Sequence, residues 1–426
     1  MKNFKPPFRC FLLCIFSLLF TSKVVSQTDS VSLGAGYTQQ VWYNLQTGAK
    51  ATSLANNWDL AFFLRSREAA IFINPVNNLH LYLTKTTAAN WATVDTAGIF
   101  TREQFNSDTS WSIGAFNRTG DNFFNYGWGG YNQATHNVTG NSVYIIQLSD
   151  GTLKKFIVDK LSYDTTFTFR QANLDGTNEQ KFTFNKINFS GKTFGYFSFL
   201  TNAPIDREPK SSDWDITFLR YNGLTPNPTS GTLQNYTLTG VLQHPDATVA
   251  KIVGKDTASN SFAGANFSGL INTIGYDWKT YNMATNQYLV ANATTYFVKR
   301  SDGKIYKLIF KSFGGSSTGN IVFSKQYLLP SSIVETDNGK NIRLSIVSNP
   351  VVGKEVELVI DSDIAINNVE VRIFSVTGAV SSTQKINLSQ GLQTLKVDVN
   401  NFNAGFYFAQ LQLGNQILTE KFVVGN

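Results

Sequence analysis

"LANNWDLAFFLRSR" (residues 54–67) and "SSDWDITFLRYNG" (residues 211–223) contain the same pattern, Trp-Asp-aliphatic-x-Phe. Apolar residues crowd together in both stretches, as they do in a strand that is buried on most of both faces. Arg65 in the first stretch and Arg220 in the second then carry the chain out to solvent. A pattern that occurs twice in this way predicts a duplicated β domain.

Further landmarks support a duplication because they recur at nearly constant spacing, which is the signature of repeated structural units. The offsets between partners lie within six residues of one another, whereas a coincidence of composition would scatter them. The pairs are "WYNLQTG" (42–48) with "YFSFLTN" (196–202) at 154 residues, Trp58-Asp59 with Trp214-Asp215 at 156, Trp128 with Trp278 at 150, and Asp150-Gly151 with Asp302-Gly303 at 152.

The fold class predicted for the whole chain is all-β. Aromatic and β-branched residues are abundant, Gly and Asn separate short apolar runs, and long windows with helical periodicity are missing. Each Asp-Gly pair stands between two alternating runs and predicts a tight β-hairpin, since glycine supplies the positive φ that such a turn needs. The length of 426 residues, at about 150 per domain, suggests two to four domains.

Residues 1–26 have the features of a secretory signal peptide. Lys2, Lys5 and Arg9 precede an apolar run over residues 10–20, and "VVS" before Gln27 resembles a cleavage site. The run is too short to span a membrane. Both cysteines lie inside this segment, so the mature chain is expected to lack disulfides, thiolate metal sites and cysteine nucleophiles. We therefore expect export through the periplasm, without a transmembrane segment in the mature chain.

Charge and motif content argue against two other classes of function. Removal of the four cations of the signal segment lowers the formal charge from +7 to +3, which does not indicate a nucleic-acid partner. Metalloprotease, nucleophile-elbow and phosphate-loop motifs are missing, so we expect no enzyme. A carboxylate pair is the remaining catalytic option, but Asp59 and Asp215 are better explained as acceptors of hydrogen bonds from an adjacent loop.

The order of the repeated landmarks resembles the HmuY family of secreted haem-binding proteins of Bacteroidetes. The second copy is the closer match, with "YFVKRSDGKIYKLIFKSF" (296–313) followed by Gly319 and "IVFSKQY" (321–327). The resemblance extends over about residues 30–329. It implies two tandem HmuY-like β domains that hold haem between strands, with two axial ligands on the iron and Lys or Arg near the propionates.

Few side chains could serve as the axial ligands that this resemblance implies. His136 in "YNQATHN" and Met283 in "YNMATN" lie at matching places just before the predicted hairpins, and His244 in "LQHPDA" could act together with Met283. Alternatively, His136 is a loop residue that bonds backbone carbonyls. Met283 could instead fill the core, and His244 could be a turn residue. His80 alternates with apolar residues and is interpreted as an ordinary strand residue.

The repeated tryptophans Trp58, Trp128, Trp214 and Trp278 are interpreted as core anchors rather than stacking platforms. The segments between the two tryptophans of each copy are rich in Asn, Gly, Ser and Thr, which is typical of loops that bind ligands. Residues 116–132 are an example of such a loop, rich in Asn and aromatic residues.

The last part of the chain has a different character. Residues 330–341 lack periodicity and predict a linker, whereas residues 342–426 alternate in short strands that suit a small immunoglobulin-like β-sandwich. Asn349-Pro350, "VRIFSVTGAV" and the terminal "LTEKFVV" resemble, in order, the type A C-terminal sorting domain of the type IX secretion system. This resemblance implies that the secretion machinery recognises residues 342–426, with Lys421 and the final residues in its signal. The alternative is an accessory β-domain without such a role.

The sequence thus predicts a signal peptide (1–26), two HmuY-like modules (27–186 and 187–329), a linker (330–341) and a sorting domain (342–426). The expected activity is non-catalytic capture of haem, free or from a haem-carrying host protein, outside the cell or at its outer surface. The rival hypothesis is a surface interaction or adhesion protein that binds glycan or protein through its loops, without haem. A third possibility is that only one module binds and the other acts as a spacer.

Overall fold

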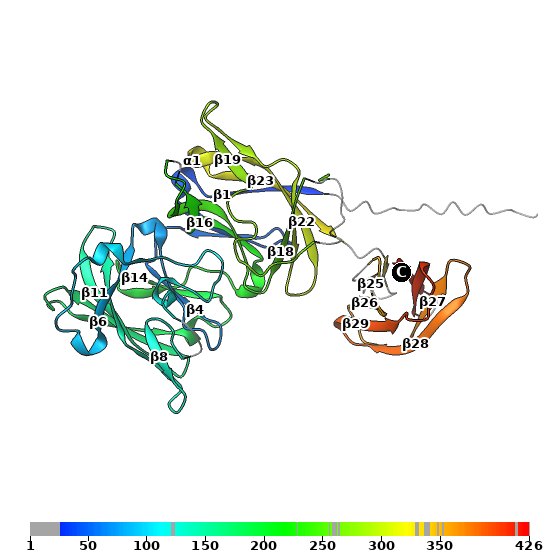
Figure 1. The fold of residues 1–426 in the computed structure, drawn as a ribbon, viewed down its shortest axis with the longest axis horizontal. Helices are drawn as coiled ribbons and strands as arrows, with labels where there is room; N and C mark the ends of the chain where they lie inside the picture. Colours follow the sequence, from blue (N-terminus) through cyan, green and yellow to red (C-terminus); the bar gives the residue numbers. More distant parts are fainter. Residues whose placement is uncertain are drawn as a thin grey trace, which may run out of the picture.

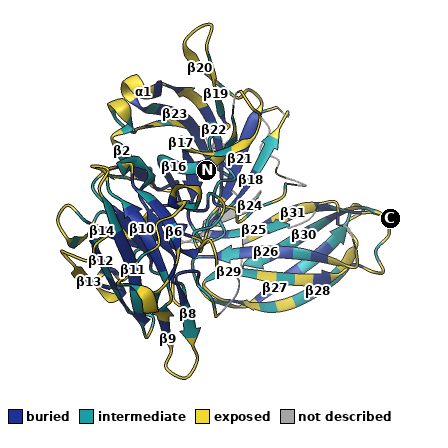
Figure 2. Ribbon diagram, turned by 60° about the vertical axis from the view of Figure 1, so that its left-hand side comes forward, coloured by how far each residue is buried: buried dark blue, intermediate teal, exposed yellow. Residues whose placement is uncertain are grey.

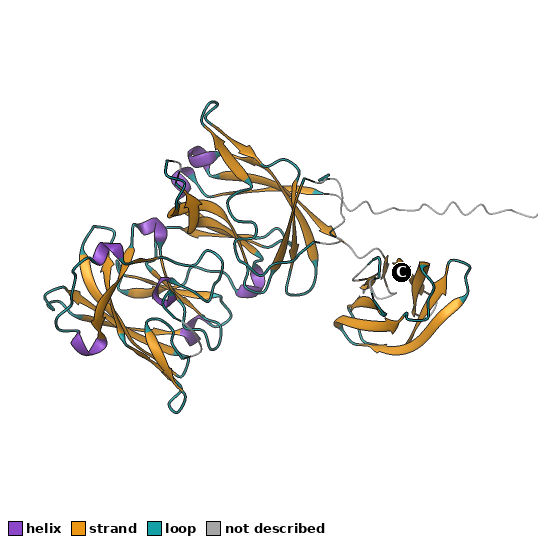
Figure 3. Ribbon diagram, in the orientation of Figure 1, coloured by secondary structure: helices purple, strands orange, loops and turns teal. Residues whose placement is uncertain are grey.

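The computed structural model describes residues 26–425 except 121–123, 228, 255, 258–261, 263–264, 329–331, 336–340, 347–348, 352 and 414–415. Strands dominate the chain, and helices are confined to short turns, as Figure 3 shows. The all-β fold class is therefore confirmed. No helix within the described residues is long and apolar enough to cross a membrane. The expected signal peptide lies outside the described residues, apart from its last residue.

Strands β4 to β15 form one body, which we call the inserted unit. Its strands are β4 (Leu60–Phe63), β5 (Ile71–Ile73), β6 (His80–Thr87), β7 (Glu103–Gln104), β8 (Gly129–Asn132), β9 (Asn137–Gly140), β10 (Ser142–Gln147), β11 (Leu153–Ser162), β12 (Thr166–Asn173), β13 (Gln180–Asn185), β14 (Phe194–Ser198) and β15 (Ala203–Ile205). A four-stranded sheet of order β15-β14-β4-β5 and a larger sheet containing β13-β12-β11-β10-β6-β7 share one core around Phe62, Trp128 and Phe169. The hairpin β8-β9 joins the larger sheet through β11.

The strands that precede β4 and those that follow β15, up to residue 328, form a second body, which we call the outer unit. Its elements are β1 (Gln27–Ser32), β2 (Gln39–Tyr43), β3 (Lys50–Leu54), β16 (Ile216–Pro226), β17 (Leu233–Gln243), β18 (Thr248–Val253), β19 (Lys279–Asn282), β20 (Gln287–Val290), β21 (Thr294–Lys299), β22 (Ile305–Phe313), α1 (Gly315–Thr318) and β23 (Asn320–Leu328). They make a four-stranded sheet β17-β16-β2-β3, a five-stranded sheet β1-β23-β22-β21-β18 and the hairpin β19-β20. Phe218, Trp278 and Phe323 lie in its core.

The two units have the same strand order. The order β15-β14-β4-β5 corresponds to β3-β2-β16-β17, and β13-β12-β11-β10-β6 corresponds to β1-β23-β22-β21-β18. Both predicted Asp-Gly hairpins are present between β10 and β11 and between β21 and β22, with Gly151 at φ 84° and Gly303 at φ 81°. The sequence offset of about 154 residues thus has a counterpart in the topology.

In the structure, the first three strands of each repeat pair with strands of the other repeat. By the sequence offset, β1-β2-β3 correspond to β13-β14-β15, yet β2 pairs with β16 and β14 pairs with β4. Figure 1 shows the blue strand β1 beside the yellow strand β23, with which it forms an antiparallel pair. We call this arrangement the strand exchange. It makes the inserted unit continuous in sequence and places it between β3 and β16 of the outer unit.

The packing units therefore differ from the expected modules 27–186 and 187–329. Strands 27–54 lie outside the unit of the first module, and β14 and β15 lie outside that of the second. Alternation of apolar residues shows which segments are strands, but two repeats offer equivalent edges, and either pairing buries the same face. The pattern alone could not choose between them.

The C-terminal unit is a β-sandwich of two four-stranded sheets, as predicted. Its strands are β24 (Ser332–Glu335), β25 (Asn341–Ile346), β26 (Glu355–Ser362), β27 (Ile366–Ser375), β28 (Val380–Leu388), β29 (Gly391–Asp398), β30 (Gly405–Leu413) and β31 (Gln416–Val424). The orders are β24-β25-β26-β29 and β28-β27-β30-β31. The predicted linker 330–341 differs from the structure at residues 332–335, because β24 is already an edge strand of this unit. The Asn349 amide binds the terminal strand through Lys421 O and Val423 N.

Candidate functional site

The repeated Trp-Asp pattern has a structural role in the strand exchange. Asp59 accepts the backbone N–H of Phe199 at 2.6 Å, and Asp215 accepts that of Leu45 at 2.7 Å. Leu45 and Phe199 are themselves equivalent at the 154-residue offset, so the same carboxylate-to-amide bond is made once in each unit. Each bond fixes the end of a strand that comes from the other repeat. The interpretation of both aspartates as acceptors for a neighbouring loop is thus confirmed.

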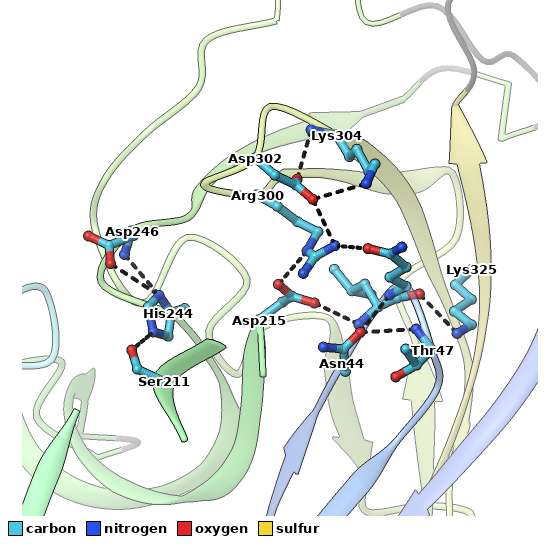
Figure 4. A network of polar contacts seen from close by, with 12 residues as sticks. Asn44, Thr47, Ser211, Asp215, His244, Asp246, Arg300, Asp302, Lys304 and Lys325 are labelled. Atoms are coloured by element: carbon cyan, nitrogen blue, oxygen red, sulfur yellow. Dashed lines mark hydrogen bonds and ion pairs between the residues drawn. The ribbon is translucent and has the colours of Figure 1, made fainter. Parts of the chain in front are cut away.

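In the outer unit this aspartate belongs to a larger polar network, drawn in Figure 4. Arg300 Nε donates to Asp215 at 2.7 Å, and Arg300 Nη1 also contacts Asp302 at 3.1 Å. Lys325 Nζ donates to the backbone oxygen of Leu45 at 2.9 Å. Burial raises the pKa of Asp215, although Arg300 acts in the opposite direction. These contacts hold the 44–49 turn against the β21–β22 hairpin.

His244 is buried, with 7 % of its surface exposed, and both ring nitrogens are engaged. Its Nδ1 accepts the backbone N–H of Asp246 at 3.1 Å, and its Nε2 lies 2.7 Å from Ser211 Oγ. Trp214 packs edge-on against the ring. Burial lowers the pKa of His244 to about 4. The geometry therefore matches the alternative interpretation, a turn histidine that holds local structure, and offers no free nitrogen.

His136 lies on the loop of the β8–β9 hairpin, and its conformation follows from the sequence "YNQATHN". The side-chain oxygen Oδ1 of Asn132 accepts hydrogen bonds from the backbone N–H groups of Ala134 and Thr135, both at 3.0 Å, and these bonds close the turn. His136 then takes a left-handed backbone with φ 53°. Its Nδ1 lies 2.9 Å from the hydroxyl of Tyr131, while its Nε2 has no partner among the described residues. The exposed imidazole is thus held at one nitrogen and open at the other.

The β19–β20 hairpin repeats this geometry with different side chains. Asn282 accepts the N–H groups of Ala284 and Thr285, and Asn286 has φ 53°. The hydroxyl of Tyr281 donates to Asn286 Oδ1 at 3.2 Å, where Tyr131 meets His136 in the other hairpin. Met283 is 82 % exposed, so it does not fill the core.

The structure does not bring the three candidate ligands together. The hairpins β8–β9 and β19–β20 project from opposite ends of the two-unit body, and their loops are exposed (Figure 2). His244 is buried in a third place, next to Trp214. His80, the remaining histidine, bonds Glu103 through Nδ1 and Asn78 through Nε2. The one candidate with a free coordinating nitrogen is His136.

Part of the aromatic segment 116–132 is built into the core, whereas Phe124 is 49 % exposed. Phe116 and Trp128 are fully buried, and the Asn117 side chain bonds Ile71 N, Ala69 O and Tyr126 O. Residues 121–123 of this segment lie outside the described part of the chain. Trp128, Trp214 and Trp278 are core anchors as predicted, whereas Trp58 is only half-buried.

Sequence reasoning missed a crevice between the two units, lined by Trp58, Trp111 and Trp214 together with Glu208. Glu208 and Arg207 come from "DREPKSSD", a charged, Pro-containing stretch that is typical of an exposed loop. Within this stretch Glu208 is buried and Arg207 is partly buried, whereas Asp206 and Lys210 stay exposed. No local sequence signal announces the burial of Glu208.

Comparison with known families identifies two segments of the chain. Residues 190–324 match the family model described as HmuY protein, and residues 348–425 match the secretion system C-terminal sorting domain. Both predicted resemblances are confirmed for these segments, and the HmuY match covers one segment only. A type IX sorting domain at this place indicates secretion or attachment at the outer surface.

The other comparisons add little. The comparison with curated proteins gives no match. Among solved structures, the chain is similar to dimeric latent PorU from Porphyromonas gingivalis, with 12 % identity, over 68 % of this chain and 32 % of that chain. The chain therefore spans about a third of the length of that structure. The TM-score of 0.20 is too low to carry an argument about fold or function.

Proposed function

Since residues 190–324 belong to the HmuY family and residues 348–425 to the sorting domains, we propose that the protein is a secreted or surface-attached haem-binding protein without catalytic activity. We place an iron ligand at His136. The observation that carries this choice is the exposed imidazole of His136, whose Nδ1 faces Tyr131 while Nε2 is open.

Tyr131 acts as the positioning residue. A phenol oxygen can accept a hydrogen bond, so Nδ1–H of His136 can donate to it, and this tautomer leaves the lone pair of Nε2 directed away from the protein. Histidines that bind metals commonly have their second nitrogen fixed in this way, and loss of that partner typically weakens metal binding 10- to 100-fold. The positive φ of His136 and the Asn132 turn fix the backbone beneath it.

The residues present fit haem in part. Haem would supply the iron and its ligand-exchange chemistry, and the chain would supply the imidazole of His136 at β8–β9. Met283 lies on the equivalent hairpin at the opposite end of the two-unit body, so it cannot bind the same iron. Neither side chain lines the aromatic crevice between the units. Haem would therefore lie at an exposed hairpin, where a haem-carrying host protein can deliver it.

We further propose that both units derive from one HmuY-like repeat. The shared strand order and the matching Asn132 and Asn282 turns support a common origin, although the family match covers only the second repeat. The repeats then diverged at the hairpin, where His136 corresponds to Asn286 and Met283 to Gln133.

A haem titration of the mature chain, residues 27–426, tests the proposal. The Soret band is followed in oxidised and reduced protein for the wild type, His136→Asn and Tyr131→Phe. Asn is a conservative choice because Asn286 occupies the same φ in the other hairpin. We expect a saturable, shifted band that His136→Asn abolishes and that Tyr131→Phe weakens at least tenfold.

Two matched controls keep the result specific. His80→Asn removes a histidine whose nitrogens are both bonded, and Tyr281→Phe removes the equivalent hydroxyl in the other hairpin. Neither should change the affinity. An unshifted band in both redox states would instead favour a surface interaction protein that keeps this fold without haem.

A further inference from the structure

Two side chains that can coordinate iron are exposed in the turns of equivalent hairpins. Met283 follows the turn residue Asn282 in β19–β20 and is 82 % exposed, and His136 lies in the turn of β8–β9. Methionine is apolar and flexible, and it is among the residues most often buried in cores. Met283 is the only methionine of the mature chain, because the other one is Met1. Its exposed position in a turn therefore calls for an explanation.

The mature chain holds few imidazole or sulfur groups, and most of them are already bonded. It has no cysteine, because both cysteines lie within residues 1–26. The ring nitrogens of His80 and His244 are all engaged by neighbouring groups. In the part of the chain that the structure describes, the open groups of this kind are thus Nε2 of His136 and the sulfur of Met283.

One molecule cannot place both groups on the same iron. The hairpins β8–β9 and β19–β20 lie at opposite ends of the two-unit body, as both Figure 1 and Figure 2 show. Iron in haem has two axial positions, one on each face of the porphyrin. His136 would occupy one of them, and residues 129–140 of its hairpin contain no second imidazole or sulfur. The second axial position would therefore face away from the molecule that holds the haem.

We propose that Met283 of a second copy of the chain binds at this second axial position, so that haem joins two copies. This inference rests on the function proposed above. Each molecule presents the histidine at one end and the methionine at the other, so the contact is head to tail. A head-to-tail contact uses two different surfaces and can repeat from copy to copy. Haem then joins the copies into dimers and longer rows.

The surfaces beside the two ligands suit a flat apolar ring. Tyr281 stands two residues before Met283, is 46 % exposed and lies beside Tyr288, with ring centroids 5.1 Å apart. In the other hairpin the backbone N–H of Tyr131 donates to the backbone oxygen of Phe124 at 2.7 Å, and Phe124 is 49 % exposed. Exposed aromatic side chains next to both ligands can pack against the porphyrin.

The contact should depend on haem and on its oxidation state. Two hairpin turns alone bury too little surface for a stable interface between proteins, and association also costs translational and rotational freedom. Binding of the sulfur to iron has to offset that cost. A thioether is a soft ligand, and ferrous iron is softer than ferric iron, as with the axial methionine of cytochromes c. Reduction should therefore tighten the association.

The test is sedimentation velocity of the mature chain, residues 27–426, over a concentration series with one equivalent of haem. The series is measured before and after reduction with dithionite. We expect dimers and larger species with haem, and more of them after reduction. Without haem the protein should be monomeric, and it should stay so with metal-free protoporphyrin, which keeps the flat ring but has no iron.

Variants of the two ligands provide a complementation test. Met283→Leu removes the sulfur at an exposed position, so it should still shift the Soret band but stay monomeric. His136→Asn should stay monomeric as well. An equimolar mixture of the two variants should form a haem-dependent dimer and nothing larger, because each variant supplies one ligand only. Leu289→Thr is the matched control, since it removes another exposed apolar side chain of the same hairpin and should assemble like the wild type.

The outcomes separate this inference from the proposed function. A shifted Soret band in a wild-type protein that stays monomeric in both redox states would refute the joining of copies and leave the proposed function intact. Assembly that survives Met283→Leu, or a mixture of variants that stays monomeric, would refute the role of Met283. An unshifted band in the wild type would refute both proposals together.

Discussion

Two buried groups near the contact between the units should give the folded protein opposing responses to pH. Burial lowers the pKa of His244 to about 4 and raises the pKa of Glu208 to about 7. The perturbation we consider is a pH series from 4 to 8, combined with His244→Gln and Glu208→Gln. Each variant removes one titrating group and leaves the other in place.

The signs follow from which state binds the proton. For His244 the unfolded chain, with a pKa near 6.5, binds an additional proton between pH 4 and 6.5, so stability is lost as the pH falls through this window. For Glu208 the folded chain binds the additional proton between pH 4.5 and 7, so stability is lost as the pH rises. Each shift of about 2.5 units corresponds to about 3 kcal/mol. The two contributions nearly cancel in the wild type.

The assay is urea unfolding of the mature chain, expressed as the free energy of unfolding of the variant minus that of the wild type. For His244→Gln this difference should rise by about 3 kcal/mol as the pH falls from 6.5 to 4. For Glu208→Gln it should rise by about 3 kcal/mol as the pH rises from 4.5 to 7. A difference that stays flat with pH for either variant would show that the group is not buried as the structure places it.

Two further predictions concern the strand exchange. Ser30 lies opposite Val322 in the β1–β23 pair, so Ser30→Cys combined with Val322→Cys should form a disulfide, seen as a faster band on a non-reducing gel. Thr183→Cys combined with Val322→Cys probes the pairing without exchange and should form none. The reverse pattern would refute the exchange. Asp215→Ala removes one of the two carboxylates that pair with Arg300 and leaves Asp302. It should cost more than Asp59→Ala, for which the loss of the hydrogen bonds should cost about 1–3 kcal/mol. Urea unfolding measures both, and equal losses would contradict the role of the ion pair.

Much of the fold follows from local patterns in the sequence. Trp-Asp strands, Asp-Gly hairpins and the C-terminal sandwich are set by alternation, by glycine at positive φ and by apolar spacing, and all of these are readable in a short window. Pairing across 150 residues is different, because β2 and β14 are interchangeable by pattern and only the whole chain decides which partner each one takes.

The candidate site could be predicted from the sequence only in part, for the same reason. The sequence placed His136 and Met283 at matching positions just before the predicted Asp-Gly hairpins. The structure shows that each lies on a hairpin of its own, β8–β9 or β19–β20, and that these two hairpins lie at opposite ends. His244 was identified as a turn residue, yet its bonds to Ser211 and Asp246 depend on tertiary packing. Trp214 and Glu208 form a shared crevice only because the exchange brings the two repeats together.

The side chain that binds the haem iron can be identified directly. The mature chain, grown with ¹⁵N-histidine and loaded with one equivalent of ferric haem, is examined by pulsed electron paramagnetic resonance for coupling between the iron and an imidazole nitrogen. We expect ¹⁵N-histidine coupling in the wild type and in His80→Asn, and its loss in His136→Asn. Coupling that survives His136→Asn, or haem that shows none in the wild type, would contradict this expectation.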